Sequence, residues 1–279
     1  MPPGNCFPQS SHIHRATRFW PTYVTDERVL QDDPDRRVVR VGDTVRRPVH
    51  PWTPAVHQLL RHLEGVGFPY SPRVRGIDAE GREVLTYLEG ESGPQGWAKL
   101  VDDTGLVSFA RFLREYHDAV AGFRLPEGLS WCTGESGPGE GEVVCHGDFG
   151  PWNIVWAQGD PVGILDWDYA RPADRLHDIA YALEYAAPFR DDAECLRWLR
   201  YPEPPDRRHC LELFAGAYGL TSTDGLVNAV IDVQKAAIEQ VRTLASRGLQ
   251  PQVRWVADGY LDDLAQRADW SRANRHLFE

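Results

Sequence analysis

The first third of the chain alternates short apolar runs with turn residues, and this pattern predicts β-strands. The runs at residues 38–41 and 44–45 flank the dipeptide Gly-Asp, which is a strong signal for a β-hairpin. Two further runs, at 73–77 and 83–88, are joined by a polar turn. We therefore expect a small antiparallel sheet in this part of the chain.

A different period, with apolar residues three and four positions apart, marks the predicted helices. The first covers residues 54–64, with Thr53 as its N-cap and Pro54 in its first turn. The second covers 105–122 and is capped by Thr104. Later helices are predicted near 191–200, 206–219, 224–247 and 252–277. Strands followed by helices are typical of the α+β class.

Three short apolar runs between residues 142 and 165 each lie beside one polar residue. Asp148 follows the first run, Asn153 precedes the second and Asp166 follows the third. A single such residue usually caps a turn, but three in this order suit magnesium-dependent phosphoryl transfer. In that chemistry one carboxylate orients the attacking hydroxyl, while an amide oxygen and a second carboxylate hold the metal on the nucleotide phosphates.

Residues 144–183, which begin VCHGDFGPWN and end ILDWDYARPADRLHDIAYAL, resemble the core of the aminoglycoside phosphotransferase family. That family is related to the choline kinases and, more distantly, to the protein kinases, and this chain looks like a divergent member. The resemblance implies that Asp148 is the catalytic base and that Asn153 and Asp166 bind Mg²⁺. It also implies that Asp178 is a buried acid that braces the catalytic loop.

The same resemblance implies a two-lobed, protein-kinase-like fold. A small N-terminal lobe would hold the antiparallel sheet, and a larger, mostly helical C-terminal lobe would follow. We expect a flexible tail at 1–19, a nucleotide-covering lobe at 20–88, and a catalytic and substrate-binding lobe at 89–279. The implied co-substrate is ATP, or alternatively GTP, and its nucleotide base would be hydrogen-bonded to the backbone of Thr86 and Leu88.

The chain departs from the resembled family in the part that would cover the nucleotide. Residues 30–37 contain acids but no glycine where a glycine-rich loop is expected. The expected lysine is also missing, so we predict that Arg46, or its neighbour Arg47, contacts the phosphates instead. Arginine keeps the charge but not the shape of lysine. Ala55 stands where the glutamate that pairs with this lysine is expected.

These departures support a second interpretation, a catalytically weak nucleotide-binding protein with a regulatory role. Magnesium-dependent ATP binding without acceptor phosphorylation would favour it. A third interpretation is a metal-dependent hydrolase built around His146, which matches the family histidine before the base. Hydrolases of that class need several histidine ligands, and this loop contains one histidine.

Composition and charge exclude several classes of protein. The net charge of −11 and the pI near 5.4 argue against a nucleic-acid partner, which would favour a basic surface. No apolar stretch approaches the ~18 residues of a membrane span, and residues 1–18 lack the apolar core of a signal peptide. The five cysteines form no C-x-x-C pair, so we expect free thiols and a cytoplasmic location.

The expected partners are a nucleoside triphosphate and a small molecule with a hydroxyl group. In the resembled family the C-terminal helices shape the acceptor pocket, and acids there bind the ammonium groups of the substrate. An aminoglycoside-like or other cationic acceptor therefore enters the prediction, although the sequence leaves the acceptor, the nucleotide and the oligomeric state open. The acidic candidates are Glu184, Asp191, Asp192, Glu194, Asp232 and Glu239.

Overall fold

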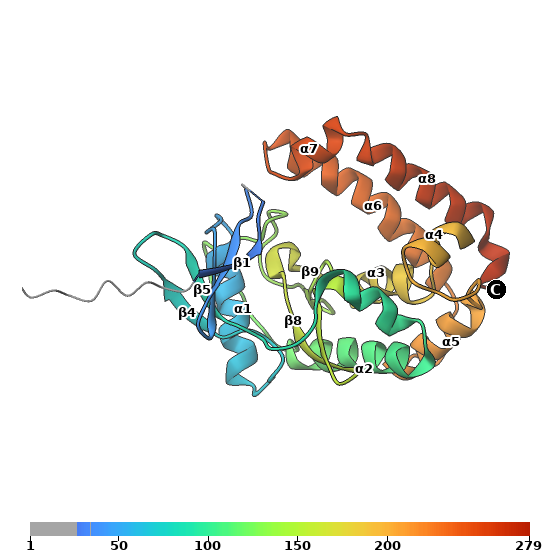
Figure 1. Cartoon of the computed structure of the whole chain (residues 1–279), viewed down its shortest axis with the longest axis horizontal. Helices are drawn as coiled ribbons and strands as arrows, with labels where there is room; N and C mark the ends of the chain where they lie inside the picture. The colour runs from blue at the N-terminus through green and yellow to red at the C-terminus, as the bar shows by residue number, and fades with distance from the viewer. Residues whose placement is uncertain (1–26, 34) are drawn as a thin grey trace, which may run out of the picture.

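The computed structural model describes residues 27–33 and 35–279, so the predicted tail at 1–19 lies outside the described residues. Figure 1 shows a β-rich lobe joined to a larger helical lobe. This arrangement confirms the predicted α+β, kinase-like architecture. The division of the chain between residues 88 and 89 stays a prediction.

The small lobe contains an antiparallel sheet with the strand order β1-β2-β3-β5-β4. The hairpin predicted around Gly42 is confirmed, because β2 and β3 pair with Val41 opposite Thr44. Gly42 takes a φ of 61°, which glycine adopts without a steric penalty. The pairing of β3 with β5 places Arg47 opposite Glu83. The strands are β1 (Glu27–Gln31), β2 (Val38–Val41), β3 (Thr44–Arg47), β4 (Val74–Ile77) and β5 (Glu83–Thr86).

One helix, α1 (Thr53–Gly65), lies beside this sheet and buries its apolar face, including Leu60. The predicted N-cap is wrong by one position. Trp52 is the N-cap residue and Thr53 is already helical. The Thr53 hydroxyl accepts a hydrogen bond from the His50 N–H (2.9 Å). It therefore closes the turn before the helix instead of capping the first helical N–H groups.

The larger lobe holds two short strand pairs and most of the helices. The strands are β6 (Val143–Cys145), which pairs with β9 (Arg171–Ala173), and β7 (Ile154–Ala157), which pairs with β8 (Asp160–Ile164). The helices are α2 (Asp103–Ala119), α3 (Leu176–Ala186), α4 (Asp192–Arg197), α5 (Arg207–Tyr218), α6 (Leu226–Ser246), α7 (Gln252–Ala257) and α8 (Tyr260–Ala273).

Two of the predicted helices need correction. The single helix predicted at 252–277 is divided into α7 and α8, because Gly259 takes a φ of 85° that a right-handed helix does not accommodate. The cap of α2 is Asp102 and not Thr104. The Asp102 carboxylate accepts from the Gly105 N–H (2.9 Å), which satisfies a free donor of the first turn.

One continuous hydrophobic core runs from α1 through α2 into the helical lobe. Tyr116 of α2 is fully buried in it and donates its hydroxyl to the carbonyl of Val144 (2.8 Å). The core thereby fixes β6, the strand that leads into the predicted catalytic loop. Within residues 27–33 and 35–279, no helix combines the length and the apolar character needed to cross a bilayer.

Helices α6, α7 and α8 form an arm that extends along the upper side of the helical lobe, with α7 at its end nearest the small lobe (Figure 1). Arg254 of α7 reaches back to Asp33, which follows β1, with Nη2 and Oδ2 2.9 Å apart. The segment that was expected to cover the nucleotide is therefore in contact with the C-terminal helices.

Candidate active site

The loop after β6 is built so that Asp148 is held in one position. Gly147 has a φ of 77°, and an added Cβ would lie 2.1 Å from the carbonyl oxygen of Tyr169, so a larger residue does not fit. The buried His146 has Nε2 2.9 Å from the Leu165 carbonyl and Nδ1 3.3 Å from the Asp148 N–H. Because the carbonyl only accepts and the N–H only donates, His146 is neutral with its proton on Nε2. Burial also lowers its pKa.

Asp178 of α3 lies under the same loop, as predicted for a buried bracing acid. Its carboxylate accepts from the N–H groups of His146 (2.6 Å) and Gly147 (2.9 Å). Burial alone would raise the pKa of Asp178, but the hydrogen bond from His117 lowers it to about 2. Asp178 therefore stays ionised and holds two backbone donors in place.

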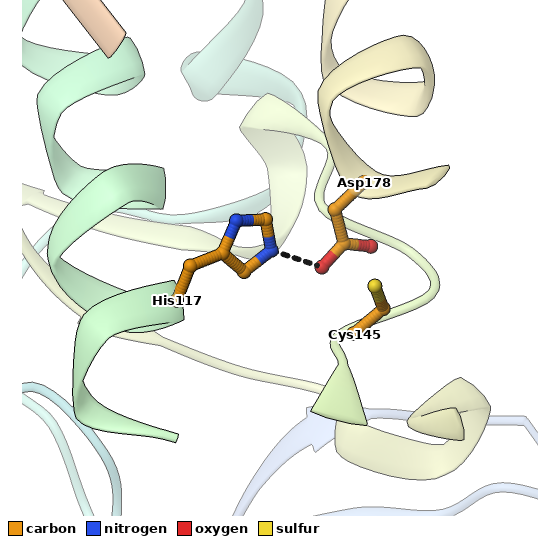
Figure 2. A group of neighbouring side chains, drawn as sticks. All are labelled: His117, Cys145 and Asp178. Carbon is orange, nitrogen blue, oxygen red and sulfur yellow. Dashed lines mark hydrogen bonds and ion pairs between the residues drawn. The ribbon is translucent and has the colours of Figure 1, made fainter. Parts of the chain in front are cut away.

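Figure 2 shows His117, Cys145 and Asp178 meeting from α2, β6 and α3. Their donor atoms lie within 4.8 Å of one another, a spacing that could suit a metal ion. However, burial raises the pKa of the Cys145 thiol well above its usual value, and its Sγ donates to the Asp174 carbonyl (3.4 Å). Both oxygens of Asp178 already accept hydrogen bonds. We interpret this cluster as a structural brace.

The carboxylate of Asp148 is held from two sides. Tyr181 of α3 donates its hydroxyl to Oδ1, and the Asn153 amide donates to Oδ2 (2.9 Å). Burial raises the pKa of Asp148 to about 7, and repulsion from the Asp166 carboxylate adds to this rise. A carboxylate with a pKa near neutrality is suited to act as a general base.

Asn153 and Asp166 each carry a side-chain oxygen without a hydrogen-bond partner among the described residues. The Asn153 Nδ2 donates to Asp148, and among the described residues its side-chain oxygen has no hydrogen-bond partner. Asp166 takes a left-handed φ of 55°, and its Oδ2 lies 2.8 Å from Nη2 of Arg36. Its Oδ1 is buried and has no hydrogen-bond partner among the described residues, with Nη1 of Arg47 at a longer 3.9 Å. An amide oxygen and an orphaned carboxylate oxygen fit a hard divalent ion such as Mg²⁺.

An arginine at the end of β3 replaces the expected lysine–glutamate pair. Arg47 donates Nε to Glu83 and Nη2 to Asp168 (2.7 Å), and its Nη1 lies 3.9 Å from Asp166. His57 of α1 adds a contact of 2.7 Å to Glu83. Burial alone would lower the pKa of Arg47, but Asp168 and Glu83 raise it, so the guanidinium stays charged. The acidic partner comes from β5 instead of α1.

Arg46, the predicted phosphate contact, is not in the position expected. Neighbouring residues of a strand point to opposite faces, so Arg46 is turned away from Arg47. Its Nε lies 3.4 Å from Asp78, and its Nη1 donates to the Thr44 hydroxyl (2.5 Å). Arg46 does not line the cleft formed by the described residues, whereas Arg47 does.

A cavity of about 950 Å³ opens between the sheet and the helical lobe, and it is lined by Asp148, Asn153 and Asp166. Thr86 and Leu88 also line it. The Thr86 N–H donates to the Arg73 carbonyl (2.9 Å), so it is not available to the base of a nucleotide. The N–H of Leu88 has no backbone partner among the described residues.

Only one of the six acids predicted to bind an acceptor lines this cavity. It is Glu184 of α3, which lies 3.4 Å from Nη2 of Arg190. The remaining acids are engaged with other protein groups within residues 27–33 and 35–279. They are Asp191 and Asp192 at the start of α4, Glu194 beside Arg190, and Asp232 and Glu239 in ion pairs along α6.

The sequence interpretation missed three residues of the site. Tyr181 could have been found, because it lies one helical turn after Asp178 and therefore on the same inward face. Glu83 could have been found from the strand pairing that places it opposite Arg47. Arg36 left no such signal, because its contact with Asp166 joins segments far apart in the chain.

Comparison with known proteins places this site in a family. The phosphotransferase enzyme family matches residues 129–213. The trifolitoxin immunity protein of Rhizobium leguminosarum bv. trifolii is 36% identical over 241 residues, which cover 82% of this chain and 90% of that protein.

Solved structures share the fold at low sequence identity. The GDP complex of aminoglycoside 2'-phosphotransferase-IIIa has a TM-score of 0.60 at 15% identity, covering 93% of this chain and 96% of that chain. The amicoumacin kinase hAmiN, solved with AMP-PNP, has a TM-score of 0.55 at 12% identity, covering 89% and 88%. The family match includes Asp148, Asn153 and Asp166, and the 36% identical relative aligns with most of the chain. This chain belongs to the phosphotransferase enzyme family.

Proposed function

We propose that this protein transfers the γ-phosphoryl group of ATP, or of GTP, to a hydroxyl group of a small molecule in a magnesium-dependent reaction. The observation that carries the proposal is the meeting of Asp148, Asn153 and Asp166 on one cavity. The hydrogen bond between Asn153 and Asp148 and the raised pKa of Asp148 support it.

Asp148 is the base in this proposal. The acceptor hydroxyl takes the place of the Tyr181 hydroxyl beside Oδ1, and its proton passes to the Asp148 carboxylate. The acceptor oxygen forms a bond to the γ-phosphorus as the bond from that phosphorus to the β–γ bridging oxygen breaks. The nucleoside diphosphate leaves with the electron pair of the broken bond.

Asn153 and Asp166 are the residues that would hold Mg²⁺. The ion would neutralise charge that develops on the phosphate oxygens. Arg36 and Arg47 lie beside Asp166 and supply positive charge from the small lobe. The free N–H of Leu88 and the carbonyl of Thr86 are the backbone groups assigned to the base of the nucleotide.

We also propose the division of the chain into a nucleotide-covering unit at 20–88 and a catalytic unit at 89–279. The cavity between sheet and helices supports it. A cytoplasmic location is supported by the four described cysteines, which are free and buried, while Cys6 lies outside the described residues.

The second candidate is nucleotide binding without phosphoryl transfer. One observation favours it, since Arg36 occupies an oxygen of the proposed metal ligand Asp166. This ion pair has to open before the carboxylate can bind a metal with both oxygens.

A screen of hydroxyl compounds with Mg·ATP and Mg·GTP tests the proposal. Release of nucleoside diphosphate, together with a product heavier by one phosphoryl group, is expected for at least one compound. The Asp148→Asn variant should lose this turnover, while Asp160→Asn, at an exposed position of β8, should retain it. Tight Mg·nucleotide binding with no product from any compound would favour the second candidate.

A further inference from the structure

The acceptor end of the cavity, formed by residues of α3, α6, α7 and α8, has no excess of negative charge. The cavity lining includes Arg36, Arg47, Asp166 and Asp168, which belong to the part assigned to nucleotide and metal. Besides these and Asp148, its charged residues in the described chain are Glu184, Arg190 and Arg267. Glu184 is only 5% exposed and lies between the two arginines, 3.4 Å from Arg190 and 3.9 Å from Arg267. Its charge is therefore already balanced. His177 also lines the cavity, but burial lowers its pKa and favours the neutral form.

Glu194, an acid outside the cavity lining, does not change this balance. Glu194 lies 3.7 Å from Nη1 of Arg190, so even with Glu194 counted the two arginines are matched and not exceeded. A substrate with several ammonium groups would have to leave water for a site without a free carboxylate other than the base. Desolvating a charge without a partner is costly.

The walls of this end are aromatic. Trp152, next to the proposed metal ligand Asn153, packs against Tyr185 with ring centroids 4.7 Å apart and against Trp97 at 4.9 Å. Aromatic faces can attract cations, but the guanidinium of Arg190 already lies over the Tyr185 ring, 5.0 Å from its centroid. The remaining ring surface suits a flat or apolar body.

Gln234 of α6 adds an unpaired amide. It lines the cavity and is 3% exposed, and neither its Nε2 nor its Oε1 has a partner among the described residues. Turning this side chain toward a ligand therefore breaks no hydrogen bond within the protein. A buried amide without partners is costly unless something pairs with it.

We propose that the acceptor is a neutral or anionic hydroxyl compound with a flat apolar body, not a polycationic amine, and that Arg267 and Gln234 position it. This inference rests on the proposed phosphotransfer and specifies its substrate class. Arg267 is the suitable anchor because its side chain is 19% exposed and its contact with Glu184 is long. An anionic group on the acceptor can approach Arg267 from the cavity.

A charge-matched ligand series tests this inference. N-acetyltyrosine, N-acetyltyrosinamide and tyrosinamide share one aromatic body and one hydroxyl but carry charges of −1, 0 and +1. Kanamycin represents the polycations. Binding of each to the full chain with Mg²⁺ and a non-hydrolysable ATP analogue is measured by calorimetry. We expect the anionic and neutral probes to bind about 10-fold or more tightly than tyrosinamide, a difference of about 1.4 kcal/mol.

Three variants sharpen the test. Arg267→Gln should remove the preference for the anionic probe, N-acetyltyrosine, over the neutral probe. Gln234→Leu should weaken the binding of both acetylated probes by about 10-fold. Arg242→Gln, at an exposed position of α6 outside this cavity, should change neither affinity. Binding of the Mg·nucleotide analogue should be the same in all three, which shows that the variants are folded.

Two results would overturn the inference. One is tighter binding of tyrosinamide or kanamycin than of the neutral probe, and the other is the absence of millimolar binding by any probe. Failure of the proposed phosphotransfer is recognised separately, as loss of Mg·nucleotide binding or as the absence of nucleoside diphosphate release in the hydroxyl screen.

Discussion

The loop that carries Asp148 and the small-lobe segment that faces it are built in different ways. In the loop, neutral groups hold the reactive carboxylate, namely the Tyr181 hydroxyl and the Asn153 amide. The facing segment is instead held by ion pairs, one between Arg36 and Asp166 and one between Asp33 and Arg254. The Tyr181 hydroxyl can give up its place to an acceptor hydroxyl while Asn153 still holds the Asp148 carboxylate. The ion pairs of the facing segment, in contrast, compete with phosphates and metal for the same charges.

This difference indicates which side of the cleft is preformed. The Asp148 loop rests on Asp178, whose contacts are buried and complete. The facing segment is held by ion pairs to the helical lobe and can exchange these partners when a nucleotide binds. Changes in the loop should therefore affect turnover, and changes in the facing segment should affect stability or nucleotide affinity.

The largest effect is expected from Asp148→Asn. Loss of the proton acceptor should lower kcat by at least about 100-fold, the usual size for a positioned base. The nucleotide affinity should change little, because the side chain is not assigned to nucleotide binding. Steady-state kinetics and calorimetry on the same preparation measure both. A variant that keeps more than a tenth of the wild-type kcat would contradict the assignment of Asp148.

Removing the guanidinium of Arg47 should have the next largest effect. Arg47→Ala leaves both Glu83, which is 0% exposed, and Asp168 without the guanidinium that they share. The free energy of unfolding should fall by about 3–5 kcal/mol, the range for breaking a buried pair. Chemical denaturation measures this loss.

Arg46→Ala is the matched control on the neighbouring position of β3. Its ion pair with Asp78 is looser, at 3.4 Å, and lies away from the cleft. A smaller loss, of about 1 kcal/mol, is expected because Asp78 keeps its ion pair with Arg82 at 2.8 Å. Equal losses for the two variants would remove the distinction drawn between the two faces of the strand.

The pH dependence of kcat/KM should report the Asp148 carboxylate. Its pKa is raised to about 7 by burial and by Asp166. Since a base must be deprotonated, kcat/KM should rise about 10-fold per pH unit below pH 7 and level off above it. The same carboxylate binds a proton more tightly in the folded protein, so its contribution to stability should decline as pH rises from about 4 to 7.

Asp166→Asn sharpens the pH experiment. Removal of the repelling charge should move the rise of kcat/KM to lower pH, although the metal ligand is weakened at the same time. A pH profile that is flat between 5 and 8 in the wild type would show that deprotonation of Asp148 does not limit the reaction.

The smallest effect is expected from Arg254→Ala. Its ion pair with Asp33 is partly exposed, with 46% and 25% of the two side chains accessible, so its contribution to stability should be small. We expect a change of about threefold or less in the KM for the nucleotide, and this change should shrink at high salt. A larger effect that persists in high salt would show that the facing segment is as rigidly held as the Asp148 loop.

The sequence was informative where function depends on local order. Asp148, Asn153 and Asp166 could be placed because each lies at the end of a short apolar run, and strand ends that meet one loop bring their side chains together. Asp178 could be assigned from its resemblance to a family motif, and its helix carries Tyr181 on the same face. The hairpin at Gly42 followed from turn chemistry alone.

Which charged side chains pair between distant segments was decided only by the tertiary structure. Arg47 and not Arg46 faces the cleft because the register of β3 on β5 selects one face, and a shift of one residue would reverse the choice. Arg36 meets Asp166, and Glu184 meets Arg267, through contacts that no local pattern encodes. The sequence by itself determined which groups could do the chemistry, because spacing along a strand or helix is short-range. Folding determined which charges remain free to meet a ligand, because neutralisation depends on distances in space.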